Sequence, residues 1–354
     1  MPERILMPLR EGLARNSPVL IALLVIGVIG CTGSDVFLTQ SNLTNLLERV
    51  APIALIAIGT TLLMIAGDLD LSIGAAVSVI SIVVAKSAEA GTVGTLVVAE
   101  AIGLGVAMSL LLGLLVTFIR APAFIVTLGA LSVFSGIALA LTNGTSIVLS
   151  GFEALGSGKV ESIPIGALIL LGVNGLAWLL LYRTSIGRSI FAVGGNPDAA
   201  RLAGFPVQTI RVLCFALNGA LVGLGAAVLA SNVGSGGPEL GTGLELQVIA
   251  AVVIGGATLG GGRGSLLGTF LGVLLLGAIA NVLNLLGAET YIGTIVFGAF
   301  IILAVTLRSE RLRSIANRGI RAVALRRADR GTVFGGRPSR AGEVGTSMGN
   351  DKPA

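Results

Sequence analysis

Two carboxylates stand in a short polar break between two apolar runs: Asp68 and Asp70, followed by Ser72. A carboxylate at the centre of a bilayer costs on the order of 3 kcal/mol, so both need water, helix caps or polar partners. Gly67 can end the helix before the break, and Asp70 or Ser72 can cap the helix after it. Three roles stay open for this break: capping, lining or gating a polar pathway, and binding a proton or ion.

Amide side chains also interrupt the apolar runs, at Asn174, Asn218, Asn281 and Asn284. Asn281 and Asn284 are three residues apart and therefore share one face of a helix. Such amides join helices by hydrogen bonds, and they can also bind the hydroxyl groups of a sugar along a water-filled path. Both interpretations stay open.

A third polar element is the segment 183–211, which contains the run Gly194-Gly195-Asn196-Pro197-Asp198-Ala199-Ala200-Arg201-Leu202-Ala203-Gly204. Asn196, or Asp198 further in, can cap a helix that Pro197 opens, and Gly204 stops it. The sequence therefore predicts a helix of about two turns, with Leu202 as its main apolar contact. An ordinary loop is the alternative, but the other loops on this side are much shorter, which favours a surface for a soluble partner.

The composition shows what kind of body carries these elements. The chain has 354 residues, of which 54% are hydrophobic and 12% charged, and its mean hydropathy is +0.97. This balance is typical of an all-α polytopic membrane protein, and the 52 glycines indicate close helix packing. The pattern predicts about ten transmembrane helices, at residues 18–33, 50–66, 71–86, 95–117, 122–142, 163–182, 209–231, 244–258, 265–287 and 290–307.

Positive charge is divided unequally between the two sides of the predicted membrane domain, 18–307. One side holds the cytoplasmic segment 1–17, the loop 183–209 and the basic tail 308–354, which has eleven Lys or Arg against four Asp or Glu. The other side holds only Arg49, Lys86 and Lys159. This bias predicts that both termini are cytoplasmic and that the tail is disordered near anionic lipid rather than a nucleic-acid module.

The start of the chain has a second interpretation. Three arginines precede an apolar run that ends at Cys31, which loosely resembles a lipoprotein signal cleaved before that cysteine. We favour an uncleaved first span, because cleavage would reverse the charge bias of everything downstream. Cys31 and Cys214 indicate neither a disulfide framework nor a metal site, and the chain contains no histidine.

The glycine-rich loop 255–265 could be mistaken for a phosphate-binding loop. It lacks the G-x-x-x-x-G-K-[ST] pattern, and G-x-G-x-x-G is absent from the chain. No cofactor is expected on this chain. Gly264, Gly268 and Gly272 recur at four-residue spacing, which predicts a close approach of another helix along the ninth span.

These motifs together resemble the permease subunits of ribose-type ABC importers, the ribose, xylose, arabinose and autoinducer-2 group. The resemblance covers roughly residues 42–308, in the blocks 66–74, 122–129, 187–204 and 243–285. This chain departs from the family pattern at Ala66, at the additional acid Asp68, and at Leu112-Gly113, where the family usually has Asn-Gly.

The resemblance implies a permease fold with a cytoplasmic coupling helix in the bacterial inner membrane. Its partners would be an ABC ATPase that carries ATP–Mg, a second permease copy or sibling, and an extracytoplasmic sugar-binding protein. The coupling residues implied are Gly194, Gly195, Asn196, Ala199, Ala200, Arg201, Leu202 and Gly204. The hypothesised substrate path comprises Asp68, Asp70, Ser72, Phe124, Thr127, Asn281 and Asn284.

Rival functions come from other classes of protein. An ion-coupled secondary sugar transporter would need acidic or histidine residues in the middle of its spans and inverted repeats, and only Asp68 and Asp70 fit that description. An intramembrane hydrolase would need a base beside a nucleophile, and the spacing of these two acids places them on different helical faces. A scaffold without transport would need neither the polar break nor the amides. The secondary transporter is the alternative that stays open.

Overall fold

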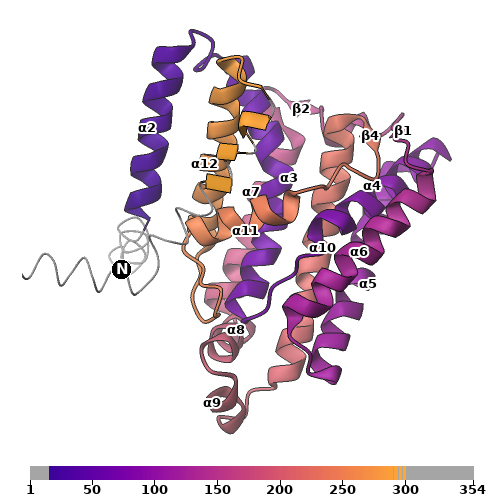
Figure 1. Cartoon of the computed structure of the whole chain (residues 1–354), viewed down its shortest axis with the longest axis vertical. Helices are drawn as coiled ribbons and strands as arrows, with labels where there is room; N and C mark the ends of the chain where they lie inside the picture. The colour runs from indigo at the N-terminus through magenta and orange to yellow at the C-terminus, as the bar shows by residue number, and fades with distance from the viewer. Residues whose placement is uncertain (1–15, 290, 294, 297, 300–354) are drawn as a thin grey trace, which may run out of the picture. The chain divides into compact units, whose positions relative to one another are not determined.

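The described part of the chain is mainly helical. The structure is a computed structural model that describes residues 16–289, 291–293, 295–296 and 298–299. Its helices are drawn in Figure 1: α2 Ser17–Gly33, α3 Gln40–Ile65, α4 Ile73–Glu89, α5 Gly94–Ile119, α6 Ala123–Thr142, α7 Ile165–Arg183, α8 Ser185–Gly195, α9 Pro197–Leu202, α10 Val207–Val233, α11 Leu244–Ile254 and α12 Leu266–Leu285.

Within these described residues, six helices are long and apolar enough to cross a membrane: α3, α5, α6, α7, α10 and α12. Two shorter apolar helices are α2 and α11. Each of the first nine predicted segments coincides with a helix, which confirms the all-α polytopic class. The tenth predicted helix, 290–307, lies largely outside the described residues, as does the N-terminal segment 1–17. The basic tail 308–354 lies entirely outside them.

Helices α3 and α8 differ most from the prediction. Helix α3 begins at Gln40 rather than at residue 50, because its polar first turns are satisfied locally. The Thr39 side chain accepts the Asn42 backbone N–H at 3.4 Å, and the Asn42 side chain donates to the Phe37 carbonyl at 2.8 Å. Helix α8 was not predicted either, since its eleven residues have no long apolar run. The Thr184 side chain caps α8 by accepting from Gly187 N at 3.3 Å.

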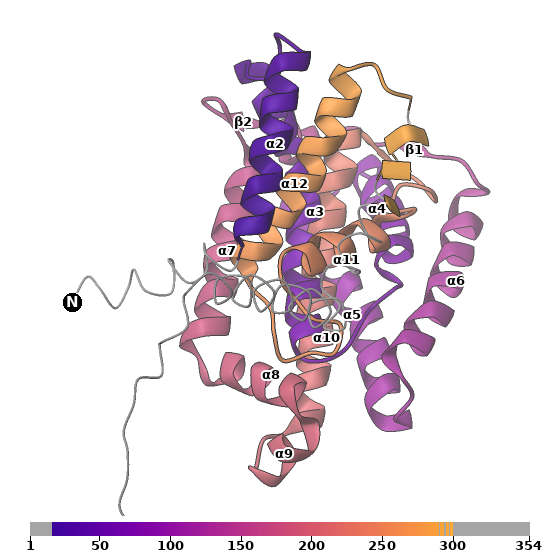
Figure 2. The ribbon, with the colours of Figure 1, turned by 60° about the vertical axis from the view of Figure 1, so that its left-hand side comes forward.

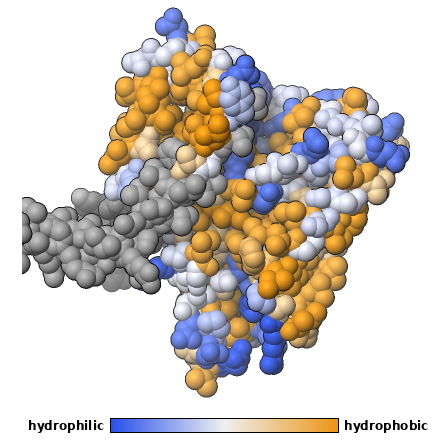
Figure 3. All heavy atoms as spheres, in the orientation of Figure 1, coloured by the Kyte–Doolittle hydropathy of each residue, from blue (hydrophilic) through white to orange (hydrophobic). Residues whose placement is uncertain are grey.

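The core lies around α3 and α10, which other helices flank in Figures 1 and 2. Helix α3 is mostly buried, whereas α6 and α7 expose many large apolar side chains, as lipid-facing helices must. In Figure 3, hydrophobic residues cover much of the middle of the face shown, and hydrophilic residues gather toward the ends.

Glycines allow the helices to approach closely. A Cβ at Gly59 would lie 2.9 Å from Asn218 Cα, and one at Gly225 would lie 2.5 Å from the Ile56 side chain, so α3 and α10 nearly touch. The predicted contact along α12 is confirmed for Gly268 and Gly272, which face the α11 backbone at Gly255 and Ala251. Gly264 precedes the helix instead.

Short antiparallel strands lie at the end of the structure opposite to α8 and α9 (Figures 1 and 2). Strand β1 (Ile147–Val148) pairs with β4 (Ser235–Gly236), and β2 (Lys159–Val160) pairs with β3 (Ile163–Pro164). The 3-10 helix η1 spans Glu153–Leu155. At this end Lys159 Nζ lies 3.1 Å from Glu48 Oε1.

Polar side chains join α3 to α12 inside this apolar body. The amides of Asn42 and Asn281 bond each other twice, at 3.0 and 2.8 Å. The hydroxyl groups of Thr61 and Thr269 lie 2.7 Å apart. Hydrogen bonds of this kind connect helices where the surroundings offer no water.

We predict that Asn281→Ala destabilises the fold, because it leaves the buried Asn42 amide without its partner. A lost interhelical hydrogen bond in a membrane costs about 0.6–2 kcal/mol. The measurement is the Tm of the detergent-solubilised protein. Asn284→Ala is the matched control, since Asn284 is exposed on the same helix. Equal losses in the two variants would contradict a stabilising role for the amide pair.

Candidate functional site

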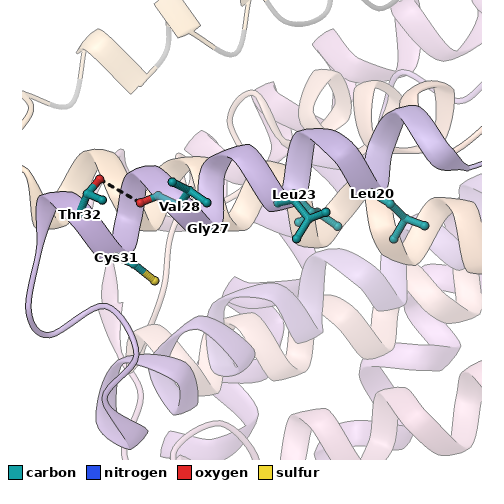
Figure 4. A pocket seen from close by; sticks show the side chains of 7 residues that line it. Leu20, Leu23, Gly27, Val28, Cys31 and Thr32 are labelled. Atoms are coloured by element: carbon teal, nitrogen blue, oxygen red, sulfur yellow. Dashed lines mark hydrogen bonds between the residues drawn. The ribbon is translucent and has the colours of Figure 1, made fainter.

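Among the described residues, two cavities differ in the chemistry of their lining. One runs along α2 and is lined by Leu20, Leu23, Leu24, Gly27, Val28, Cys31 and Thr32. Figure 4 shows these side chains, with the Thr32 hydroxyl already bonded to the Val28 carbonyl at 2.9 Å. An apolar lining of this kind suits lipid and offers little to a polar solute.

The second cavity is small and lies where the α3–α4 break meets α5, α6 and α10. It is lined by Asp70, Ser72, Ile73, Ala76, Gly105, Met108, Ser109, Phe134, Gly219 and Val222. Within it, Asp70 and Ser72 from the break face small residues of α5 and α10. Asp70, Ser72 and Ser109 supply the polar part of its lining, and we call it the polar cavity.

Asp70 is held by neutral hydrogen-bond donors. Its Oδ1 accepts from the Ser72 backbone N–H at 2.9 Å and from the Ser72 hydroxyl at 2.6 Å. Its Oδ2 accepts from the Asn218 amide at 3.1 Å. Ser72 is therefore the residue at the N-cap position of α4, but the side chain that satisfies a backbone N–H there is that of Asp70. All three of these donors are neutral groups.

Asp68 has a different partner. Arg211, near the start of α10, donates from Nε to Asp68 Oδ2 at 2.7 Å and from Nη2 to Asp68 Oδ1. The Asp68 side chain is 2% exposed and that of Arg211 is 30% exposed. A two-pronged guanidinium–carboxylate pair fixes orientation as well as distance. Sequence reasoning missed Arg211, although a buried acid requires such a partner.

The helix break itself is closed by backbone bonds. Gly67 ends α3 with a φ of +95°, as predicted, a conformation that favours glycine. Its N–H donates to the Met64 carbonyl, and the Asp68 N–H donates to the Leu63 carbonyl, each at 3.1 Å. This is the Schellman arrangement, which satisfies the last carbonyl groups of the helix.

The remaining residues of the hypothesised path are scattered. The Thr127 hydroxyl lies 2.9 Å from the Ala123 carbonyl and 3.4 Å from the Leu69 carbonyl, so it borders the break. Phe124 is half exposed on the outside of α6. Asn281 is bonded to Asn42, and Asn284 is exposed. Of the seven residues of the hypothesised path, the structure brings Asp70, Ser72 and Thr127 to one region and pairs Asp68 with Arg211. It places Phe124, Asn281 and Asn284 elsewhere.

The predicted helix in the polar segment is α9, which lies with α8 at one end of the structure in both ribbon views (Figures 1 and 2). The Asn196 side chain caps it by accepting from the N–H groups of Asp198 and Ala199, at 3.1 and 3.0 Å. Gly204, at a φ of +85°, closes its other end. Leu202 is 91% exposed.

The other side chains of α9 include one that is buried against the protein and two that are exposed to solvent. Ala200 is buried against the body of the protein. Arg201 forms an exposed ion pair with Asp198 at 3.1 Å. A capped, short helix therefore presents one large apolar side chain and one ion pair outward. Such a surface suits a protein partner.

Comparison with known proteins gives a consistent family. Residues 42–305 match the family described as "Branched-chain amino acid transport system / permease component". The chain is 37% identical to the ribose import permease protein RbsC of Escherichia coli (strain K12) over 299 residues, 82% of this chain and 93% of that protein. It is 36% identical to RbsC of Bacillus subtilis over 305 residues, which are 85% and 95% of the two chains.

A third relative is the autoinducer 2 import system permease protein LsrC of Yersinia enterocolitica, 34% identical over 315 residues, 88% of this chain and 86% of that protein. No solved structure matches the chain. These matches support the permease interpretation and give no support to an ion-coupled secondary transporter. The chain therefore belongs to this family of permease components, in its ribose-type ABC importer group, and is a multi-pass membrane transport subunit rather than an enzyme.

Proposed function

We propose that this chain is the transmembrane subunit of an ATP-driven importer that moves a monosaccharide or a related small polar solute across the bacterial inner membrane. The names of its relatives, ribose import and autoinducer 2 import permeases, support this solute class. The observation that carries the proposal is α9, a capped helix that exposes Leu202 outside an otherwise apolar helical body.

The polar end that holds α9 is assigned to the cytoplasm in this proposal. Arg183, Arg188, Arg201 and Arg211 lie on or beside α8–α10, while Lys86 and Lys159 lie near the strands at the other end. This division follows the positive-inside rule. Both termini are then cytoplasmic, and the binding protein delivers solute to the strand end.

The partner ATPase would bind α9 and would carry the ATP–Mg. Residues 194–204 form the coupling segment, with Leu202 and the Asp198–Arg201 pair as its outward contacts. Closure of the ATPase would rock the spans between two states, as a rigid-body switch. A second copy of this chain, or a sibling permease, would complete the pathway.

The solute path is proposed to pass the cavity beside Asp70. A carboxylate, a hydroxyl group and an amide together suit a ligand that carries several hydroxyl groups. At this cavity the backbones of α5 and α10 meet at Gly105 and Gly219, so a small movement between these two helices would change the size of the cavity.

We predict that Gly195→Trp abolishes ATPase binding and uptake while the chain still inserts and folds. An added Cβ at Gly195 meets nothing within 4 Å, so the indole extends outward toward the partner. Arg201→Glu is expected to act in the same way by reversing the charge of an outward contact. The measurements are co-purification with the partner ATPase and ATP-dependent uptake in vesicles.

Gly175→Trp on α7 is the control for bulk, since its Cβ position is equally open. It should leave ATPase binding unchanged. Normal uptake by Gly195→Trp at wild-type protein level would refute the coupling role of this segment.

A second prediction concerns the path. In a chain with Cys31→Ser and Cys214→Ala, the Ser72→Cys variant should react with a small hydrophilic methanethiosulfonate reagent during turnover and hardly at all at rest. The reason is that Ser72 is buried here but lines the cavity that must open. The modification rate with and without ATP, measured by mass spectrometry, checks this expectation.

Ser81→Cys provides the comparison, because Ser81 is also buried on α4 but does not line the cavity. It should stay unreactive in both conditions. If both variants react equally, or neither responds to ATP, the path does not pass Asp70.

A further inference from the structure

Three backbone segments cross at glycines where α9 begins. The Gly262 N–H donates to the Ile65 carbonyl, at the end of α3, at 2.8 Å. Gly194, in the last turn of α8, lies against both groups: a Cβ there would be 2.7 Å from Gly262 N and closer still to the Ile65 carbonyl. Gly261 is equally confined, because its Cβ would lie 2.6 Å from the Gly194 carbonyl and 2.8 Å from Gly67 Cα. The end of α8 is therefore seated on the end of α3.

The chain that follows the coupling segment is attached just beyond the end of α3 by an ion pair. Arg211 follows α9 by nine residues along the chain and holds both oxygens of Asp68. Asp68 is one residue beyond Gly67 and two before Asp70. Residues 65–68 are thus contacted by the backbone of Gly194, which precedes α9 in the chain, and by the side chain of Arg211, which follows it.

We propose that these two attachments form a clamp through which the coupling segment moves the Asp68–Asp70 break. Gly194, Gly261 and Gly262 form its backbone side, and Asp68 with Arg211 forms its ionic side. A displacement of α9 then acts directly on the residues beside the polar cavity, without first passing through the length of a span. The clamp rests on the proposed function, since it requires an ATPase that moves α9.

Backbone hydrogen bonds, not the ion pair, close the end of α3. Helix α3 already ends in backbone bonds that use the Asp68 N–H and leave its carboxylate free for Arg211. Helices α3 and α10 already touch at Gly59 and Gly225. A buried ion pair is often no more stabilising than apolar residues of the same size, and its best-attested use is to fix register or a switch. Passing the displacement of α9 to the Asp68–Asp70 break is a role that fits these contacts.

The test uses the chain with Ser72→Cys, Cys31→Ser and Cys214→Ala, assembled with its partner ATPase in liposomes. Two quantities are measured: ATP hydrolysis, and the change that ATP causes in the methanethiosulfonate reaction of the Ser72→Cys position. In this parent we expect ATP to change the reaction rate by about tenfold. A parent without any ATP response would contradict the proposed function itself, and so would be distinguished from failure of the clamp.

Adding Arg211→Met to the parent should separate the two quantities. Hydrolysis should stay within about twofold of the parent, whereas the ATP-dependent change in reactivity should be lost. Arg211→Lys keeps the charge and should restore part of the response. Lys159→Gln breaks a different ion pair at the strand end and should change neither quantity.

Preserved ATP response in Arg211→Met would overturn the proposal. If that variant does not assemble, the pair Asp68→Asn with Arg211→Gln replaces it, because two neutral amides leave no unpaired buried charge. Loss of assembly in this pair as well would show a purely structural contact and would also overturn the proposal.

The backbone side is tested by Gly261→Ala in the same parent. The new Cβ would press on Gly194 and Gly67 at a φ of +81°, so the ATP response should fall while hydrolysis continues. Gly260→Ala is the matched control, since its Cβ meets nothing within 4 Å. Equal effects of the two substitutions would contradict the backbone side of the clamp.

Discussion

A backbone that leaves the helical path inside a membrane must find partners for its own N–H and C=O groups, because lipid supplies none. Among the described residues, the non-helical segments 66–72 and 255–265 meet, and a backbone hydrogen bond joins the second segment to the end of α3. Each preceding helix closes on a glycine with positive φ, at Gly67 and Gly256. The Gly262 N–H donates a hydrogen bond to the Ile65 carbonyl. The end of α8 is seated at this bond, since a Cβ at Gly194 would lie 2.7 Å from Gly262 N.

The two aspartates of the break 66–72 have different hydrogen-bond partners, and this difference distinguishes their roles. Asp68 is neutralised by a guanidinium, so its charge is used inside the protein. Asp70 accepts hydrogen bonds from a hydroxyl, an amide and a backbone N–H, and it lines the polar cavity. The two aspartates, although only two positions apart, therefore differ in their partners: Asp68 forms an ion pair, whereas Asp70 has neutral donors.

The sequence was sufficient for whatever depends on local pattern. Apolar runs predicted the places of nine helices, and Asn196, Pro197 and Gly204 predicted a short helix where α9 lies. It was insufficient for pairings between distant segments: Arg211 with Asp68, Asn42 with Asn281, and the contact of Gly194 with Gly261. Each of these joins residues far apart in the chain, and residue type alone names several equally suitable partners. The extended start of α3 was missed because polar first turns look like a loop.

Helix α9 has six residues, too few to be stable alone, so its shape must come from its attachments. Asn196 caps one end, the turn at Gly204 closes the other, and Ala200 is buried against the protein. Burying the exposed Leu202 in a partner would contribute only about 1.5–3 kcal/mol, which is modest for the contact that we propose carries movement. Rigid attachment therefore matters more than affinity at this surface. A loosely held helix would bind the same partner yet yield at its own ends when pushed, whereas one fixed at both flanks passes the displacement on to the break.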